Sequence, residues 1–111
     1  MIIILAKNYP YGTLLSGVWD ELITLPNRKQ KIRFRDVSLN TGMDTISIPY
    51  AEMYATYTLG DFIENHGYNA ETIVGHRITF RNQEKFGTGF NGEPYLLKTF
   101  FQPIAIDEVI K

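Results

Sequence analysis

Residues 29–37 of this chain alternate with period two, and cationic side chains occupy every second position as far as Arg35. The cations occupy one set of alternate positions: Lys29, Lys31, Arg33 and Arg35. Gln30, Ile32 and Phe34 occupy the other set. Side chains two residues apart share one face of a β-strand. The pattern therefore predicts a strand with one buried and one exposed face, and a sheet to hold it.

The length and composition indicate one domain with an apolar core. The chain has 111 residues, of which 44% are hydrophobic, and it has no cysteine. A disulfide scaffold, a thiolate zinc site and a cysteine nucleophile are therefore excluded, and a reducing compartment fits. Eleven Lys and Arg against twelve Asp and Glu leave a net charge of −1. Bulk charge thus favours neither a nucleic-acid binder nor an acidic DNA mimic.

The amino terminus is apolar from Met1 to Ala6, with Lys7 after it. A signal peptide needs a basic start and a longer apolar region, and a membrane span needs about 20 apolar residues. We expect a buried strand here, a cytoplasmic protein and no membrane partner.

Turn residues divide the rest into short elements. Residues 43–48 predict a second strand, joined to the first in a hairpin by the Asn40-Thr41-Gly42 turn. One or two short helices are predicted over 49–66, starting at Pro49 and ending before Gly67. Within them, Thr58 and Asp61 have the spacing of a capping box.

Strands are then predicted at 72–81 and 95–101. The glycine-rich stretch 87–92 matches G-x-G-x-x-G, but a strand rather than a helix follows it, so we interpret it as a hairpin turn with Asn91-Gly92 at its tip. Pro103 should end the second of these strands, and 104–110 adds a last short one.

Residues 13–25 decide between two folds. Their apolar residues fall on one helical face, which slightly favours a helix, although Gly17 interrupts the pattern and residues 18–25 also suit a strand. If they form a strand, the order β-β-β-α-β-β over residues 18–101 resembles the OB-fold, a mainly β five-stranded barrel. If they are helical, an α+β antiparallel sheet with helices on one face is expected.

The cationic strand suggests a nucleic-acid site. Its alternate side chains are spaced about 6.6 Å apart, on the scale of successive phosphates in a single strand. Arg77 and Arg81 share a face of the predicted strand 72–81, and Lys85 follows near the turn. Three other interpretations stay open: neutralisation by the protein's own carboxylates, protection of a sheet edge, and binding of another anionic partner.

Aromatic residues supply the stacking surface that single-strand binding needs. The candidates are Trp19, Tyr50, Tyr54, Tyr57, Phe86, Phe90 and Tyr95. The helical spacing of Tyr50, Tyr54 and Tyr57 favours core packing for those three. Phe86 and Phe90 are stronger candidates because they flank the glycine-rich turn.

We therefore predict a non-catalytic protein without metal or cofactor, since no motif of ligands, or of nucleophile and base, surrounds His66 or His76. The topology resembles the single-stranded DNA-binding proteins of phages and plasmids, which implies a role in DNA replication or recombination. Binding is expected to be non-specific, with DNA favoured over RNA. The predicted nucleic-acid-binding residues are Lys29, Lys31, Arg33, Arg35, Arg77, Arg81, Lys85, Phe86, Phe90 and Tyr95.

Two alternatives remain. A small regulatory or inhibitory module would use the same aromatic side chains to bind a protein. A subunit of a homo-oligomer would pair through its apolar first or last strand.

Overall fold

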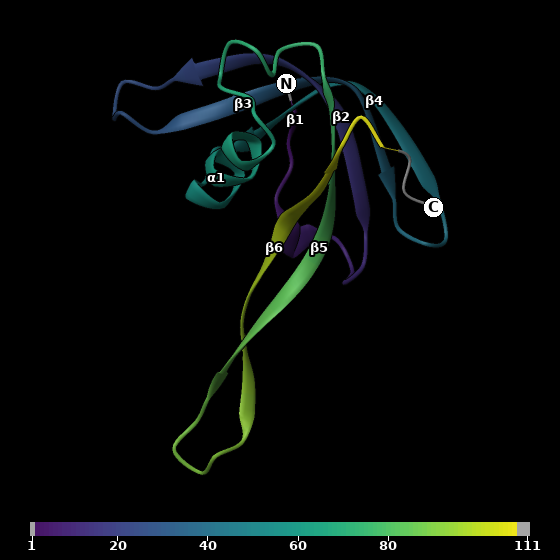
Figure 1. The fold of residues 1–111 in the computed structure, drawn as a ribbon. Helices are drawn as coiled ribbons and strands as arrows, with labels where there is room; N and C mark the ends of the chain where they lie inside the picture. The colour runs from purple at the N-terminus through teal and green to yellow at the C-terminus, as the bar shows by residue number, and fades with distance from the viewer. Residues whose placement is uncertain (1, 109–111) are drawn as a thin grey trace.

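The computed structural model describes residues 2–108 and is mainly β (Figure 1). Its six-stranded sheet has the order β1-β4-β3-β2-β5-β6, antiparallel except between β1 and β4. The elements are β1 (Ile2–Ile3), the 3-10 turn η1 (Ala6–Asn8), β2 (Leu14–Thr24), β3 (Gln30–Asn40), β4 (Thr45–Tyr54), α1 (Tyr57–Asn65), β5 (Arg77–Thr88) and β6 (Pro94–Ile106). The sheet is open, with β1 and β6 at its two edges.

The ambiguous segment 13–25 is the strand β2, so the preference for a helix was wrong. Leu15 and Trp19 point into the core. Between them, Gly17 lies so close to Phe34 that a Cβ at Gly17 would be 2.8 Å from the Cβ of Phe34. β2 pairs with β3 on one side and β5 on the other. This pairing along both edges outweighs the helical periodicity of its apolar residues.

The helix predicted from Pro49 was also wrong, because β4 continues through Pro49 to Tyr54. β1 pairs with β4 only at Ala51 and Glu52. Pro49 therefore lies outside the segment that β1 covers, and a strand tolerates a residue without an N–H there. Ala51 and Met53 point into the core, whereas Tyr50 and Tyr54 are about half exposed.

The helix α1 begins two residues earlier than the predicted capping box. The Thr56 side chain accepts a hydrogen bond from the Leu59 N–H at 3.2 Å, in place of the expected Thr58 and Asp61 pair. The predicted stop at Gly67 is confirmed, since this residue has a φ of 85° after the last turn. Within residues 2–108, no helix is both long and apolar enough to cross a membrane.

The last two strands form a hairpin longer than predicted. The first strand starts at Arg77 rather than residue 72, because the Asn69 side chain holds residues 69–72 in a turn by accepting two backbone N–H groups. The second strand passes through Pro103, which lies opposite Phe80 at a register shift, so the predicted break was wrong. Residues 104–106 belong to this same strand, and residues 109 and 110 of the predicted last strand lie outside the described residues.

The outer half of this hairpin projects from the body of the protein (Figure 1). We call residues 83–100 the arm. Its tip is the predicted turn: the Gly92 N–H donates to the Gly89 carbonyl at 3.0 Å, and Gly92 has a φ of 77°. The placement of Asn91-Gly92 at the tip is confirmed.

At the amino terminus, the prediction of a buried strand holds only in part. β1 is short, and both of its residues, Ile2 and Ile3, are exposed. Ile4, the next residue, is buried against the core, and its N–H donates to the Glu52 carbonyl at 2.8 Å. β1 ends at Ile3, and the backbone turns at η1 two residues after Ile4.

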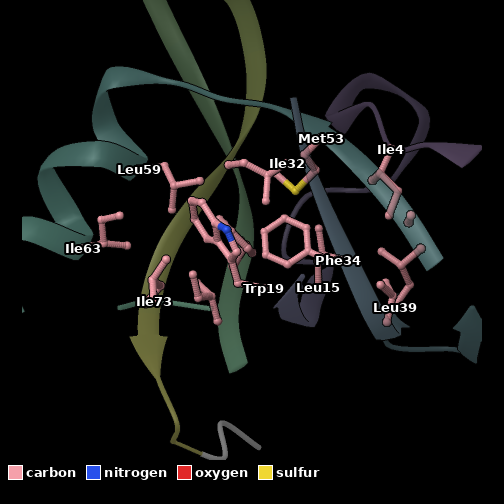
Figure 2. Close-up of a cluster of buried hydrophobic side chains, with 14 residues drawn as sticks. Ile4, Leu15, Trp19, Ile32, Phe34, Leu39, Met53, Leu59, Ile63 and Ile73 are labelled. Carbon is pink, nitrogen blue, oxygen red and sulfur yellow. The ribbon is translucent and has the colours of Figure 1, made fainter. Parts of the chain in front are cut away.

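The core lies between one face of the sheet and α1 (Figure 2). Trp19, Phe34 and Phe80 pack edge to face, with ring centroids 5.9 and 5.8 Å apart. Leu59 and Ile63 of α1 cover one end of this aromatic row. Trp19 is therefore a core residue and is removed from the candidates for base stacking.

Candidate nucleic-acid interface

The predicted alternation in β3 is confirmed from Gln30 to Arg35. At Asp36, which has a φ of 50°, the register with β2 shifts, so Val37 is buried rather than placed with the cations. Ile32 and Phe34 are buried, and Lys31, Arg33 and Arg35 lie on the opposite, outer face of the sheet. Lys29 lies in the turn before the strand and is exposed.

Carboxylates of the protein pair with the three cations within β3. Lys31 Nζ lies 3.1 Å from Glu52 Oε1, and Arg33 Nε lies 2.9 Å from Asp20 Oδ2. Arg33 also pairs with Glu21, and Arg35 Nε lies 4.0 Å from Asp20. The hydrogen bond to Asp20 raises the pKa of the Arg33 guanidinium above its usual value. The alternative of internal neutralisation therefore describes these three residues.

A register shift in β2 explains how two successive carboxylates reach one guanidinium. The register between β2 and β3 shifts by one residue between Trp19 and Glu21. Asp20 is the extra residue of β2 and has no partner directly opposite it in β3. Such a bulge turns neighbouring side chains toward the same side of the strand. Sequence alone did not reveal this, because the pairing partner of Asp20 depends on the register.

Two tyrosines join the cations on the outer face. Arg35 lies opposite Tyr50, and Lys31 lies opposite Tyr54, in the β3–β4 register. Both tyrosines were predicted to pack in the core as part of a helix, and that prediction was wrong. The alternation of Tyr50 and Tyr54 with Ala51 and Met53 is the signal that would have placed them correctly.

The arm carries a second cationic face. Lys85 lies directly opposite Lys98, Gln83 opposite Phe100, and Gly87 opposite Tyr95. Residues opposite each other share a face, and positions two apart along a strand share it too. β6 has one extra residue at the register shift between Lys85 and Phe86, so the faces are counted along β5, from Arg81 through Lys85 to Gly87. Counted in this way, the arm face that continues to Arg81 holds the residues Arg81, Lys85, Tyr95, Lys98 and Phe100.

These cations are not neutralised as those of β3 are. Among residues 2–108, no carboxylate lies within ion-pair distance of Arg81, Lys85 or Lys98. Lys98 Nζ lies 5.8 Å from the ring centroid of Phe100 instead. Lys98 and Phe100 were missed in the sequence because the predicted strand 95–101 was assigned no faces.

The opposite side of the arm carries Glu84 across from Thr99 and is apolar beyond this pair. Phe86 lies across from Leu96, and 55% and 51% of their surfaces are exposed. Phe90 at the tip is fully exposed. The structure therefore separates two predicted site residues: Tyr95 lies on the cationic arm face, and Phe86 lies on the other.

Arg77 lies away from the arm, at the start of β5. Its NH1 group donates to Ser16 Oγ at 3.0 Å and to the Asp36 carbonyl at 3.1 Å. The guanidinium thus connects β5 to β2 at Ser16 and to β3 at Asp36, and it does not join Arg81 and Lys85 in one cluster.

A groove of about 670 Å³ lies between the β2–β3 turn, the end of β4 and α1. Its lining includes Arg28, Lys29, Tyr54, Tyr57, Asp61 and Glu64. A second groove, of about 300 Å³, runs along the edge of β6 and is lined in part by Lys98, Phe100 and Tyr54. Because both are lined by Tyr54 and Thr56, the two grooves adjoin, and the surface runs from the arm to the β2–β3 turn.

No family model, curated protein or solved structure matches the chain.

Proposed function

We propose that this protein binds single-stranded nucleic acid, DNA in preference to RNA, through the cationic face of its arm. The observation that carries the proposal is the direct opposition of Lys85 and Lys98. Like charges directly across a strand pair destabilise it. A phosphate between the two ammonium groups removes that repulsion, so the arm is more stable with a polyanion bound.

Aromatic rings on the same face supply the second half of the site. Phe100 and Tyr95 flank the lysine pair on the β6 strand. Single-strand binders combine a cationic track with rings on which bases stack, and each stacked base contributes about 1–3 kcal/mol. The arm face offers both within one hairpin.

The connectivity supports an OB-like interpretation. Strands β2, β3 and β4 are consecutive and antiparallel, α1 follows them, and β5 returns to pair with β2. From β2 on, this matches the β-β-β-α-β-β order of the OB-fold, with the connection between the last two strands extended into the arm, although the sheet is open rather than closed into the predicted five-stranded barrel. A role in replication or recombination in the cytoplasm, in a phage or plasmid context, follows from that resemblance.

The cations of β3 have a smaller part in this proposal. Their carboxylate partners must be displaced before a phosphate binds, which offsets much of the gain. Lys29 and Arg28, at the end of the same hairpin, are exposed and without an ion-pair partner among the described residues.

A titration with fluorescent oligo-dT at several salt concentrations tests the proposal. Three phosphates bound by Arg81, Lys85 and Lys98 predict a log–log slope of about −2, from about −0.7 for each contact. The double variant Lys85→Gln/Lys98→Gln should bind much more weakly and show a slope shallower by about 1.4.

The double variant Thr45→Glu/Ser47→Glu is the matched control. It changes the net charge by the same amount, at exposed positions of β4 outside the arm. It should bind almost as wild type does. Absence of binding at low salt would reject the proposal, and equal losses in the two variants would mean that only net charge matters.

The apolar side of the arm favours one alternative, a protein-binding regulatory or inhibitory module, of which self-association is one form. Phe86 and Leu96 are large, exposed and adjacent, as in interface hot spots. The variant Phe86→Ser/Leu96→Ser should leave oligo-dT binding intact if the arm binds nucleic acid by its cationic face. Failure to bind oligo-dT, in wild type and variant alike, would favour the alternative.

A further inference from the structure

The larger groove has three chemically different parts in one surface. Arg28 and Lys29 enter it from the β2–β3 turn. Asp61 and Glu64 enter it from α1, one helical turn apart. Tyr54 and Tyr57 line it at the end of β4 and the start of α1. Its volume of about 670 Å³ accommodates a nucleotide with its solvent.

None of these charged groups is neutralised within the protein. In the part of the chain that the structure describes, no ion pair includes Arg28, Lys29, Asp61 or Glu64. Opposite charges therefore line one groove without pairing across it. A ligand that has an anionic part and hydrogen-bond donors matches both kinds of group at once.

The tyrosines are available to such a ligand. Tyr57 is 94% exposed and Tyr54 is 45% exposed, and each is next to the turn of chain that joins β4 to α1. Exposed rings of this kind stack on nucleobases of any type. Hence stacking gives affinity in this groove but no selectivity between bases.

We infer that this groove binds one nucleotide of a single strand, selecting bases that carry an exocyclic amino group. The phosphate contacts Arg28 and Lys29, the base stacks on the tyrosines, and its amino group donates to Asp61 or Glu64. The inference rests on the proposed function, and it adds a base preference to binding that the arm makes without one.

The carboxylates of the groove distinguish cytosine from uracil. A carboxylate accepts a hydrogen bond from the N4 amino group of cytosine, as it does in base readout by Asp and Glu. Uracil and thymine present a carbonyl oxygen at that position, which a carboxylate repels. The preference is therefore for cytosine, and by the same contact for adenine and guanine, over uracil and thymine.

The adjoining groove along β6 connects this contact to the arm. Lys98 and Phe100 line it at one end, and Tyr54 belongs to both grooves. A single strand lying along this surface meets the arm and the larger groove together. An oligonucleotide long enough to contact both the arm and the larger groove should therefore bind with an affinity that depends on its bases.

Competition at neutral pH between oligo-dC and oligo-dU of equal length tests the inference. These two differ at the base edge that meets the carboxylates and share the same backbone. Oligo-dC should bind about fivefold more tightly than oligo-dU. This factor is at the lower end of the range for side-chain hydrogen bonds to a base, because the groove is open to solvent.

The variant Asp61→Asn/Glu64→Gln should abolish the preference, because an amide both donates and accepts and serves either base. Removing two negative charges should also strengthen oligo-dU binding. The variant Glu71→Gln, at an exposed position outside the groove lining, should retain the preference.

The outcomes separate the two proposals. Equal affinities for oligo-dC and oligo-dU in wild type, with binding present, would overturn the base preference and leave the proposed function standing. A preference that survives Asp61→Asn/Glu64→Gln would overturn the groove as its source. If neither oligonucleotide binds at low salt, the proposed function itself fails.

Discussion

At the scale of single residues, Gly17 shows how a small position shapes the sheet. It lies in β2, the strand with partners on both sides, and directly beneath the Phe34 ring. Phe34 in turn packs against Trp19 and Phe80. The glycine that interrupts the helical pattern in the sequence is thus the residue that lets the aromatic row approach the sheet.

Gly17→Ala should therefore destabilise the protein. The added Cβ would lie 2.8 Å from the Phe34 Cβ, so the strand or the ring must shift, at a cost of about 1–3 kcal/mol. Denaturant unfolding followed by tryptophan fluorescence measures the change in the free energy of unfolding.

Gly60→Ala is the matched control. Gly60 lies within α1, with nothing within 4 Å of an added Cβ, and alanine favours a helix by up to about 1 kcal/mol. Its free energy of unfolding should stay equal or rise. A Gly17→Ala protein as stable as wild type would contradict the close packing of β2 against Phe34.

At the scale of elements, the arm differs from the rest of the sheet. The body of the sheet buries one face against the core, whereas the arm has both of its faces exposed near the tip. A two-stranded ribbon of this kind is only marginally stable by itself. Ligand binding along the arm therefore changes its order more readily than that of the body.

Phe90→Ala separates binding from folding in this element. Phe90 is fully exposed at the tip, so its loss should change the free energy of unfolding by no more than about 0.5 kcal/mol. If a base stacks on it, oligo-dT binding should weaken by about 1–3 kcal/mol.

Met43→Ala offers a comparison at the tip of the other hairpin, since Met43 is 92% exposed in the β3–β4 turn. It should alter neither stability nor binding. Loss of folding in Phe90→Ala, or unchanged binding, would remove Phe90 from the site.

At the scale of the whole molecule, the pair of His76 and Asp107 joins the ends of the sheet's last strands. His76 Nδ1 lies 2.5 Å from Asp107 Oδ2, and the Arg77 N–H donates to the other carboxylate oxygen at 3.0 Å. The His76 carbonyl accepts from the Trp19 N–H, which extends the connection to the core. The hydrogen bond from His76 is the main cause that lowers the pKa of Asp107 below its ordinary value.

This pair predicts a pH dependence of stability. A carboxylate whose pKa is lower in the folded state stabilises the protein above its unfolded pKa, near 3.9, and loses that contribution as the pH falls through the folded value. Asp107→Asn should therefore reduce the thermal midpoint at neutral pH. The difference from wild type should shrink as the pH falls below about 4. A difference independent of pH would contradict the role of the Asp107 charge.

Local patterns in the sequence predicted what depends on local chemistry. The alternation of buried and outer side chains up to Arg35, the stop at Gly67 and the tip at Asn91-Gly92 follow from side-chain period and from backbone freedom at glycine, which act within a few residues. The candidates at Lys85, Phe90 and Tyr95 came from the same kind of evidence, and the structure places all three on the arm.

Which surfaces stay free depends on contacts between segments that are distant in the sequence. Residues 13–25 and 49–54 have helical spacing, yet both are strands, because pairing along the sheet contributes more than local periodicity. Asp20 and Glu21 reach Arg33 through a bulge whose register involves two strands. The ion pairs that neutralise the β3 cations join segments that are distant in the sequence, and so does the groove that Tyr54 forms with the β2–β3 turn. The order of residues determines these contacts only through the fold that brings those segments together.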